Sequence, residues 1–357
     1  MSTILATIVV IGILIFVHEL GHFLVAKWYG VGVEVFSLGF PPKLLHKQVG
    51  ETDYRLSVIP LGGYVKMVGE NPREEIPPEL IPKSFSHRPL GPRVAIVAAG
   101  PMFNLLFSIV ALTLVFTFSG MPYFTTEIGS IQPDSPAAQA GLQPGDRVLQ
   151  IGQQPVARWE ELAQLIRGSG EQPLELTIQR GEEIFSRTIT PRRMETANVF
   201  GEKVSAVMIG ISVSDKSVVE RVNPVVALWE GVTHTARILE ITTISVAKLI
   251  TRQIPLESLG GPIMIAQVAG KQAELGVSNL IHFMAVLSVN LALLNILPIP
   301  MLDGGHLVFF LLEAIRGKPV TLKHREMAQS IGLMVILLLM FLVFYNDIIR
   351  LLGPSQP

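Results

Sequence analysis

Two histidines and a glutamate form a short pattern that could bind a metal ion. The pattern is H-E-x-x-H, and its residues are His18, Glu19 and His22. Positions i and i+4 of a helix lie on one face, so both imidazoles can reach one Zn²⁺. Glu19 then stands beside a water molecule that the metal activates, where it can act as a general base. The pattern predicts metal-assisted hydrolysis.

The surroundings of this pattern strengthen the prediction. His18, Glu19 and His22 lie inside residues 4–26, an almost entirely apolar run that is long enough to cross a membrane. An ionisable residue at membrane depth costs about 2.5–3.5 kcal/mol. A bound metal ion would offset the free-energy cost of placing three such residues within five positions. The alternative is that these residues form a polar patch, and that hydrogen bonds to neighbouring helices satisfy its donors and acceptors.

A catalytic zinc usually has a third protein ligand and one open position. The chain has no cysteine, so this ligand must be His, Asp or Glu. Asp303 follows an apolar run, at a depth similar to that of His18 and His22. His306 and Glu313 are the competing candidates, and Asp303 is favoured for its position.

The composition indicates a membrane protein. Of the 357 residues, 49% are hydrophobic and only 16% are charged, whereas a soluble domain usually has about a quarter charged residues. The apolar surplus predicts four transmembrane helices, at 1–30, 94–118, 277–300 and 328–350. The formal net charge of −1 gives no sign of a nucleic-acid partner.

The chain resembles the site-2 protease family, the intramembrane zinc metalloproteases, over nearly its whole length. The H-E-x-x-H pattern in the first predicted span is one signature of that family. The second lies near the third span and comprises Asn295, Pro298, Pro300, Leu302, Asp303 and Gly304. Within the family, the chain is most similar to the subgroup of bacterial regulators of sigma-E proteolysis. Residues 135–146 look like part of a PDZ domain, and the insert has room for one such domain.

The resemblance implies that His18, His22 and Asp303 bind Zn²⁺ and that Glu19 is the catalytic base. The expected substrate is the transmembrane helix of a single-pass protein, such as a trimmed anti-sigma factor or a remnant signal peptide. A helix must unwind locally before it can be cut, because its carbonyls are hydrogen-bonded. A sheet within residues 31–68 could hold the unwound segment as an added strand.

Three further residues are expected to contact the substrate. Asn295 could hydrogen-bond the extended backbone of the substrate. Pro298 and Pro300 interrupt the helix and could keep irregular backbone around the site. The alternative for both prolines is that they only end the span.

The expected fold is a multi-pass α-helical membrane protein with four transmembrane helices, a membrane-associated β-sheet and one extracytoplasmic α+β PDZ domain. Basic residues after the first span and between the third and fourth place those loops in the cytoplasm. The active site would lie near the cytoplasmic side of a bacterial inner membrane. The segments between the spans are assigned as follows. Residues 31–93 form a cytoplasmic-side β region and loop, and residues 125–195 form the PDZ domain. Residues 196–276 form a linker with amphipathic helices, and residues 301–327 hold the Leu302-Asp303-Gly304 motif and a cytoplasmic loop.

Two other functions compete with intramembrane proteolysis. One is a non-catalytic membrane scaffold in which the PDZ domain does the work. The other is a metal transporter that uses the intramembrane histidines, but the second and fourth spans contain few polar residues to line a path. The expected partners are single-pass membrane proteins and membrane lipid, and a peptide ligand of the PDZ domain is also possible.

Overall fold

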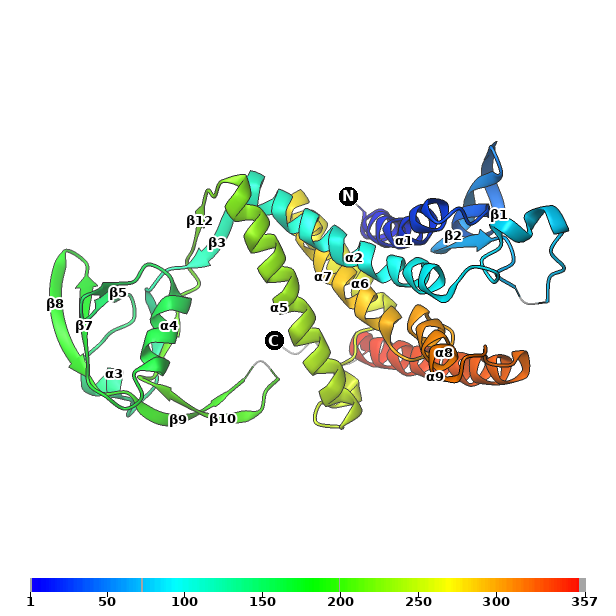
Figure 1. Ribbon diagram of the computed structural model, residues 1–357. Coiled ribbons are helices and arrows are strands. Elements are labelled where there is room, and N and C mark those ends of the chain that lie inside the picture. Colours follow the sequence, from blue (N-terminus) through cyan, green and yellow to red (C-terminus); the bar gives the residue numbers. More distant parts are fainter. Residues whose placement is uncertain (1, 72, 199, 353–357) are drawn as a thin grey trace. The chain divides into compact units, whose positions relative to one another are not determined.

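The chain consists of two compact units. A computed structural model describes residues 2–71, 73–198 and 200–352 (Figure 1). Unit 1 comprises Met1–Val115 and Pro224–Pro357, and unit 2 comprises Phe116–Asn223. Unit 1 contains the predicted metal-binding residues.

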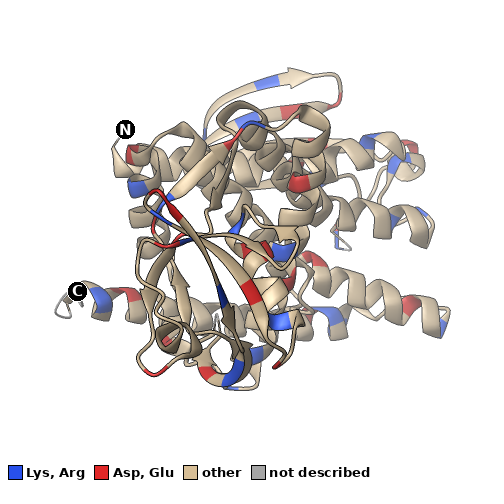
Figure 2. Ribbon diagram, turned by 90° about the vertical axis from the view of Figure 1, so that its left-hand side faces the viewer, with Lys and Arg blue, Asp and Glu red and all other residues tan. Residues whose placement is uncertain are grey.

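Four helices among the described residues are long and apolar enough to cross a membrane, in agreement with the predicted number. They are α1 (Thr3–Trp28), α2 (Leu90–Ser119), α7 (Val277–Ile296) and α9 (Leu322–Leu352). Figure 2 shows that most of the helical ribbon carries neither basic nor acidic residues. Such helices satisfy their own backbone hydrogen bonds and can lie in lipid.

Three further helices complete unit 1. They are α5 (Pro224–Ile250), α6 (Pro262–Leu275) and α8 (Asp303–Arg316), and short 3-10 helices occupy Pro78–Lys83 and Leu256–Ser258. The buried Asp347 of α9 accepts hydrogen bonds from the backbone N–H groups of Gly261, Ile263 and Met264. A carboxylate at a helix N-terminus satisfies N–H groups that lack partners and complements the helix dipole. Asp347 therefore fixes the start of α6 to α9.

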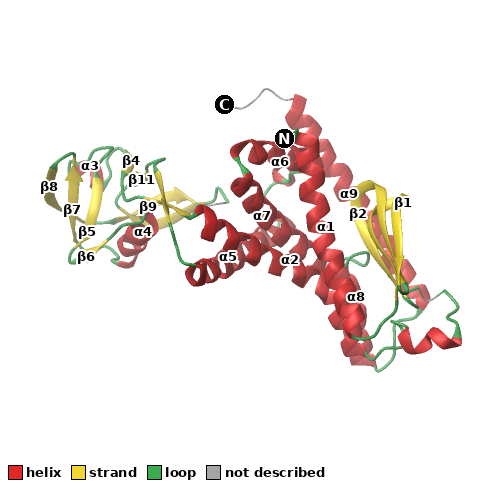
Figure 3. Cartoon of the chain, turned by 90° about the horizontal axis from the view of Figure 1, so that it is seen from above, coloured by secondary structure: helices red, strands yellow, loops and turns green. Residues whose placement is uncertain are grey.

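A sheet made of β1 (Val33–Val49) and β2 (Thr52–Met67) lies alongside α1 (Figure 3). Both strands fold back, so that the first part of β1 has partners on both sides. Phe36 pairs with Val65 on one side and with Tyr54 on the other. The segment 63–67 is consequently an edge of the sheet, with one side unpaired among the described strands.

The sheet packs on α1 through aromatic residues. The ring centroids of Phe23 and Phe36 are 5.2 Å apart, and those of Phe23 and Tyr54 are 5.8 Å apart. Gly63 also approaches α1 closely, since a Cβ atom there would lie 2.9 Å from a methyl group of Ile15. This packing holds the edge segment beside the H-E-x-x-H turn.

Unit 2 is an α+β unit with a buried apolar core. Its central sheet has the strand order β6-β5-β7-β8, and α4 (Trp159–Gly168) contributes Leu162 and Ile166 to the core. The strands of this sheet are β5 (Arg147–Ile151), β6 (Gln154–Pro155), β7 (Leu174–Arg180) and β8 (Glu183–Ile189). The other elements are β3 (Met121–Phe124), β4 (Ile128–Ile131), α3 (Pro136–Gln139), β9 (Arg192–Ala197), β10 (Lys203–Met208), β11 (Ile211–Val213) and β12 (Ser217–Glu220).

Unit 2 extends beyond residues 125–195, the range expected for the PDZ domain. Strands β10, β11 and β12 lie within 196–276, where the sequence indicates a linker and amphipathic helices. β11 pairs with β4 and β12 pairs with β3, both far earlier in the chain. β11 and β12 form through distant partners, and local periodicity does not reveal such pairing.

An ion pair in unit 2 gives a prediction on stability. Asp146 is buried, and its carboxylate accepts hydrogen bonds from Arg180 Nε at 2.7 Å and from the backbone N–H of Gln143 at 2.8 Å. Burial opposes ionisation, but these hydrogen bonds outweigh it and hold the pKa of Asp146 below its ordinary value. We expect Asp146→Asn to destabilise unit 2 by about 2 kcal/mol at pH 7. Hydrogen exchange of the β5 and β7 amides in the full chain measures this change.

The same pKa shift sets the pH dependence. A carboxyl with a lowered folded-state pKa stabilises the fold above its unfolded pKa and loses this effect as pH falls through the folded pKa. The difference between wild type and Asp146→Asn should therefore shrink below about pH 4. The exposed Asp215 provides the control, since Asp215→Asn should leave the exchange unchanged. A difference that is the same at pH 3 and pH 7 would contradict the assignment.

Candidate metal centre

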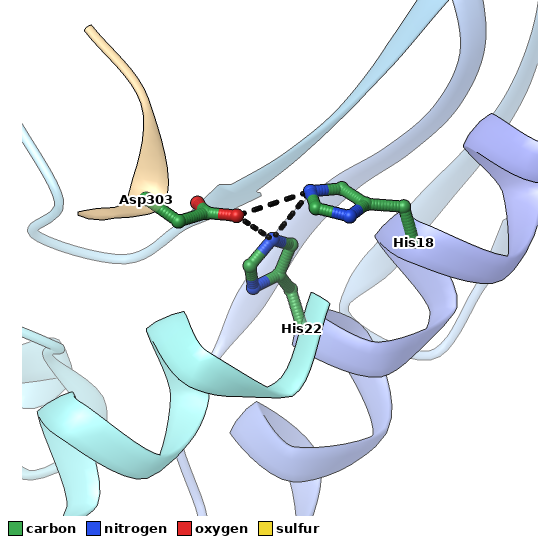
Figure 4. Close-up of side chains that lie close together, drawn as sticks. All are labelled: His18, His22 and Asp303. Atoms are coloured by element: carbon green, nitrogen blue, oxygen red, sulfur yellow. Dashed lines mark hydrogen bonds and ion pairs between the residues drawn. The ribbon is translucent and has the colours of Figure 1, made fainter. Parts of the chain in front are cut away.

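Helix α1 presents two imidazoles on one face. His18 and His22 are one helical turn apart and nearly buried, with exposures of 9% and 8%. Their Nε2 atoms lie 3.2 Å from each other. Figure 4 shows both rings turned toward Asp303.

Asp303 reaches the imidazoles from the first residue of α8. Its Oδ2 atom lies 3.2 Å from His18 Nε2 and 3.6 Å from His22 Nε2 (Figure 4). A tight turn after α7 brings it there, and the next residue must be small. A Cβ atom on Gly304 would lie 2.1 Å from the carbonyl oxygen of Ile296. Only glycine permits this close approach of backbone to backbone.

Helix α2 fixes the orientation of His22. His22 Nδ1 lies 2.8 Å from the carbonyl oxygen of Ile96. A carbonyl can only accept, so Nδ1 carries the proton and Nε2 keeps a lone pair. Hydrogen bonds of this kind set the tautomer of metal-binding histidines.

His18 has a corresponding partner in Asn104. Asn104 Nδ2 lies 3.2 Å from His18 Nδ1, while Asn104 Oδ1 is buried without a hydrogen-bond partner. Exchanging the two ends of the amide brings the oxygen to Nδ1, which then donates to it. Nε2 of His18 is then free to bind a metal as well.

The three donor groups suit zinc. Asp303 Oδ2 is buried and accepts no hydrogen bond, and two imidazole nitrogens face it. The ligand atoms all lie within 4.8 Å of one another. Zinc bonds of about 2.0–2.1 Å at tetrahedral angles separate ligand atoms by about 3.3 Å, close to the observed distances. Two nitrogens and one oxygen form a donor set that zinc accepts, with a fourth position left open.

Glu19 lies between the donor cluster and the sheet. A Cβ atom on Gly63 would be 3.1 Å from Glu19 Cγ and 2.9 Å from the carbonyl oxygen of Ser37. The absence of a side chain at Gly63 therefore leaves room for the glutamate beside the edge segment 63–67.

Comparison with known proteins identifies the family. The model of peptidase family M50 matches residues 6–339. The chain belongs to this family. A protein from Agrobacterium fabrum named as a zinc metalloprotease is 37% identical, and the alignment covers 97% of this chain and 95% of that protein. The zinc metalloprotease RasP of Geobacillus kaustophilus is 31% identical, with 98% of each chain covered.

These findings confirm the predicted site-2 protease type. This M50 peptidase is a zinc metalloendopeptidase, and zinc is its cofactor. A solved structure also matches part of the chain. A PDZ domain of an SdrC-like protein from Listeria monocytogenes matches 26% of this chain and 90% of its own length, at 20% identity and a TM-score of 0.22. At this score the PDZ assignment stays a prediction from the sequence.

The structure separates the candidates for the third ligand of the M50 site. Glu313 forms an ion pair with Arg93, whose guanidinium contacts both carboxylate oxygens of Glu313. Neither oxygen is therefore available to a metal ion. His306 lies one turn after Asp303 on α8 and is outside the donor cluster. Burial and the nearby Arg325 lower the pKa of His306, so its imidazole is neutral at pH 7.

The residues expected to contact the substrate lie at the end of α7 and in the connection to α8. Asn295 is half-buried near the end of α7, and Pro298 and Pro300 lie in the connection that follows. Pro300 packs against Gly332 of α9, where a Cβ atom would lie 3.1 Å from the proline Cδ. The prolines therefore end α7 and shape the connection that carries Asp303.

The contribution of α2 to the M50 site was not foreseen. The predicted set of metal-binding and catalytic residues includes neither Asn104 nor Gly100. A polar residue inside an apolar span was the available signal for Asn104. At Gly100, a Cβ atom would lie 2.3 Å from His22 Nε2 and 2.7 Å from His18 Cε1. Gly100 leaves the space that the two imidazoles occupy.

We expect Gly100→Ala to weaken zinc binding by at least about tenfold, since the added methyl group displaces both imidazoles. Zinc content after dialysis against a graded chelator measures this effect. Gly91→Ala is the matched control, because Gly91 lies on the same helix with nothing within 4 Å of a Cβ atom. Equal zinc retention by the two variants would show that the close approach of α2 has no bearing on the metal centre.

Proposed function

We propose that this peptidase hydrolyses peptide bonds inside the transmembrane segments of single-pass membrane proteins. The main support is the depth of the site. The donor groups of His18, His22 and Asp303 converge, and both histidines belong to an apolar helix that can cross a membrane. A protease with its metal centre on such a helix meets substrates within the bilayer.

In this proposal, His18 and His22 hold zinc through Nε2, and Asp303 holds it through Oδ2. Zinc bound there supplies Lewis-acid chemistry, which acidifies water and polarises a peptide carbonyl. Glu19 accepts the proton of the attacking water and delivers it to the leaving amine. Asn104 and the Ile96 carbonyl keep the imidazoles in the required tautomer.

The edge segment 63–67 is the proposed binding place for the unwound substrate. A substrate helix must exchange its own hydrogen bonds for others before cleavage, and an unpaired strand edge offers them. Gly63 in this segment lies beside Glu19, since a Cβ atom there would be 3.1 Å from Glu19 Cγ, so an added strand would pass close to the base. The half-buried amide of Asn295 is the proposed partner of the extended backbone on the α7 side. Pro298 and Pro300 keep the connection to α8 irregular there.

Unit 2 is the proposed PDZ domain. We place it outside the cytoplasm and the metal centre near the cytoplasmic side of the bacterial inner membrane, from the distribution of basic residues. A PDZ domain there would bind peptide ends or limit the size of substrates that reach the site. The sheet of β1 and β2 would lie against the membrane on the cytoplasmic side, in line with exposed apolar residues such as Leu44 and Leu45.

Cleavage in liposomes tests the proposal. The purified chain is reconstituted with synthetic single-pass peptides, and mass spectrometry locates the cut. We expect cleavage within the apolar segment, its loss with a zinc chelator and its return on adding zinc. Cleavage confined to soluble flanking sequences would contradict intramembrane proteolysis while leaving the peptidase activity intact.

A further inference from the structure

A polar cavity of about 680 Å³ lies in unit 1 between the end of β2, the loop after it, and helices α8 and α9. Met301 and His306 line it, and these residues flank Asp303 on either side. His306 and Asp303 are three positions apart on α8, so their side chains lie on the same face of the helix. The cavity therefore reaches to within one helical turn of the metal centre.

Three cations line the cavity, and two of them have carboxylate partners. Lys66 contacts Glu34 at 2.8 Å and Glu74 at 3.0 Å. Arg73 pairs with Glu326 of α9. The charges of these two side chains are balanced within the protein.

The third cation, Arg325, is different. Its guanidinium lies over the Phe309 ring, 5.7 Å from the centroid, and no carboxylate of a described residue lies within 4 Å of it. Glu70, which also lines the cavity, accepts a hydrogen bond from the backbone N–H of Met67. A half-buried guanidinium without a carboxylate partner beside a cavity is suited to bind an anion from outside the chain.

We propose that this cavity, the Arg325 cavity, is a subsite for the carboxylate of a cleaved peptide, with Arg325 as its anchor. The inference rests on the proposed function, because each hydrolysis creates one new carboxylate at the metal centre. That anion forms beside apolar helices, where an isolated charge is costly. Arg325 of α9 lines the same cavity as His306, which is one helical turn from Asp303. Its cation stabilises the carboxylate as the product leaves, and the planar guanidinium matches both carboxylate oxygens.

Binding of a product peptide tests the subsite without turnover. Wild type first cuts a synthetic single-pass peptide that has no acidic residue near the cut, which establishes the activity and the product. The fragment that ends at the cut is then made as a free acid and as a C-terminal amide. Fluorescence anisotropy compares their binding to zinc-loaded Glu19→Gln protein. We expect the acid to bind about tenfold more tightly than the amide.

Variants of Arg325 show whether this residue is responsible. In the Glu19→Gln background, Arg325→Gln should bring the acid-to-amide ratio close to one, and Arg325→Lys should retain part of the preference. Lys323→Gln is the matched control, because Lys323 is an exposed cation on the same turn of α9 outside the cavity lining. Zinc content is measured in all variants. Equal zinc content shows that a change in binding comes from the loss of the anion site and not from the loss of the metal.

Several results would overturn the proposal. One is equal binding of the acid and the amide by protein with Arg325 intact. Another is a preference for the acid that persists in Arg325→Gln, since that preference would come from the metal alone. A third arm uses substrates with Asp or Glu beside the cut. If only these depend on Arg325, while acid and amide products bind equally, the anchored carboxylate is a substrate side chain. Failure of wild type to cut any peptide would count against the proposed function and not against this subsite.

Discussion

Glu19→Gln is expected to lower the rate of peptide hydrolysis by about 10³-fold while zinc stays bound. Glutamine keeps the size and most of the packing of Glu19 beside Gly63, but it cannot accept a proton from water. General acid–base catalysis contributes about 10²–10⁴-fold to such reactions, which sets the size of the loss. Initial rates of cleavage in liposomes, with zinc content measured on the same samples, give both readouts.

The controls for Glu19→Gln separate chemistry from folding. Glu79→Gln removes an exposed carboxylate of the 3-10 helix Pro78–Lys83 and should leave the rate unchanged. Retained cleavage in Glu19→Gln would remove Glu19 as the base. Lost zinc would show instead that the substitution disturbs the ligands. A rate loss with normal zinc content also excludes a purely scaffolding role for the chain.

Asp303→Ala is expected to abolish stable zinc binding, with affinity reduced more than about 100-fold and hydrolysis lost with it. Asp303 Oδ2 is the only oxygen among the three donor groups, and two imidazoles alone leave two coordination positions without a protein ligand. Zinc content after dialysis, measured by atomic absorption, reports the ligand directly. Loss of a residue that only hydrogen-bonds a ligand lowers metal affinity by about 10–100-fold. The size of the loss therefore distinguishes a ligand from a supporting residue.

His306→Asn is the informative comparison for Asp303→Ala. His306 is the competing histidine one turn away on α8, and its replacement should leave zinc content unchanged. The reverse outcome, with zinc retained by Asp303→Ala and lost by His306→Asn, would assign the third ligand to His306. Glu313 is a poor candidate on structural grounds, because Arg93 contacts both of its oxygens.

The catalytic pattern and the membrane helices were readable from the sequence because they depend on local spacing. The i, i+4 relation places His18 and His22 on one face of a helix wherever that helix lies. The four apolar helices follow from residue composition over about 20 positions. Asp303 was favoured from its place after an apolar run, and the structure brings it to both imidazoles.

What local spacing could not reveal was which distant residues meet these elements. The close approach of α2 at Gly100, the hydrogen bond of Asn104 to His18 and the pairing of Glu313 with Arg93 all join positions far apart in the chain. The folding back of β1 and β2, which makes 63–67 an edge, is likewise a matter of long-range pairing.

The sequence by itself therefore determined the chemistry that we propose for this protein: two histidines, one glutamate and an acidic third ligand on apolar segments. Only the tertiary structure decided how the imidazoles are oriented, which carboxylate is free, and that Arg325 faces a cavity without a carboxylate partner. The physical reason is that helix periodicity is encoded within a few turns. Hydrogen bonds, ion pairs and close backbone contacts between elements depend on how those elements pack.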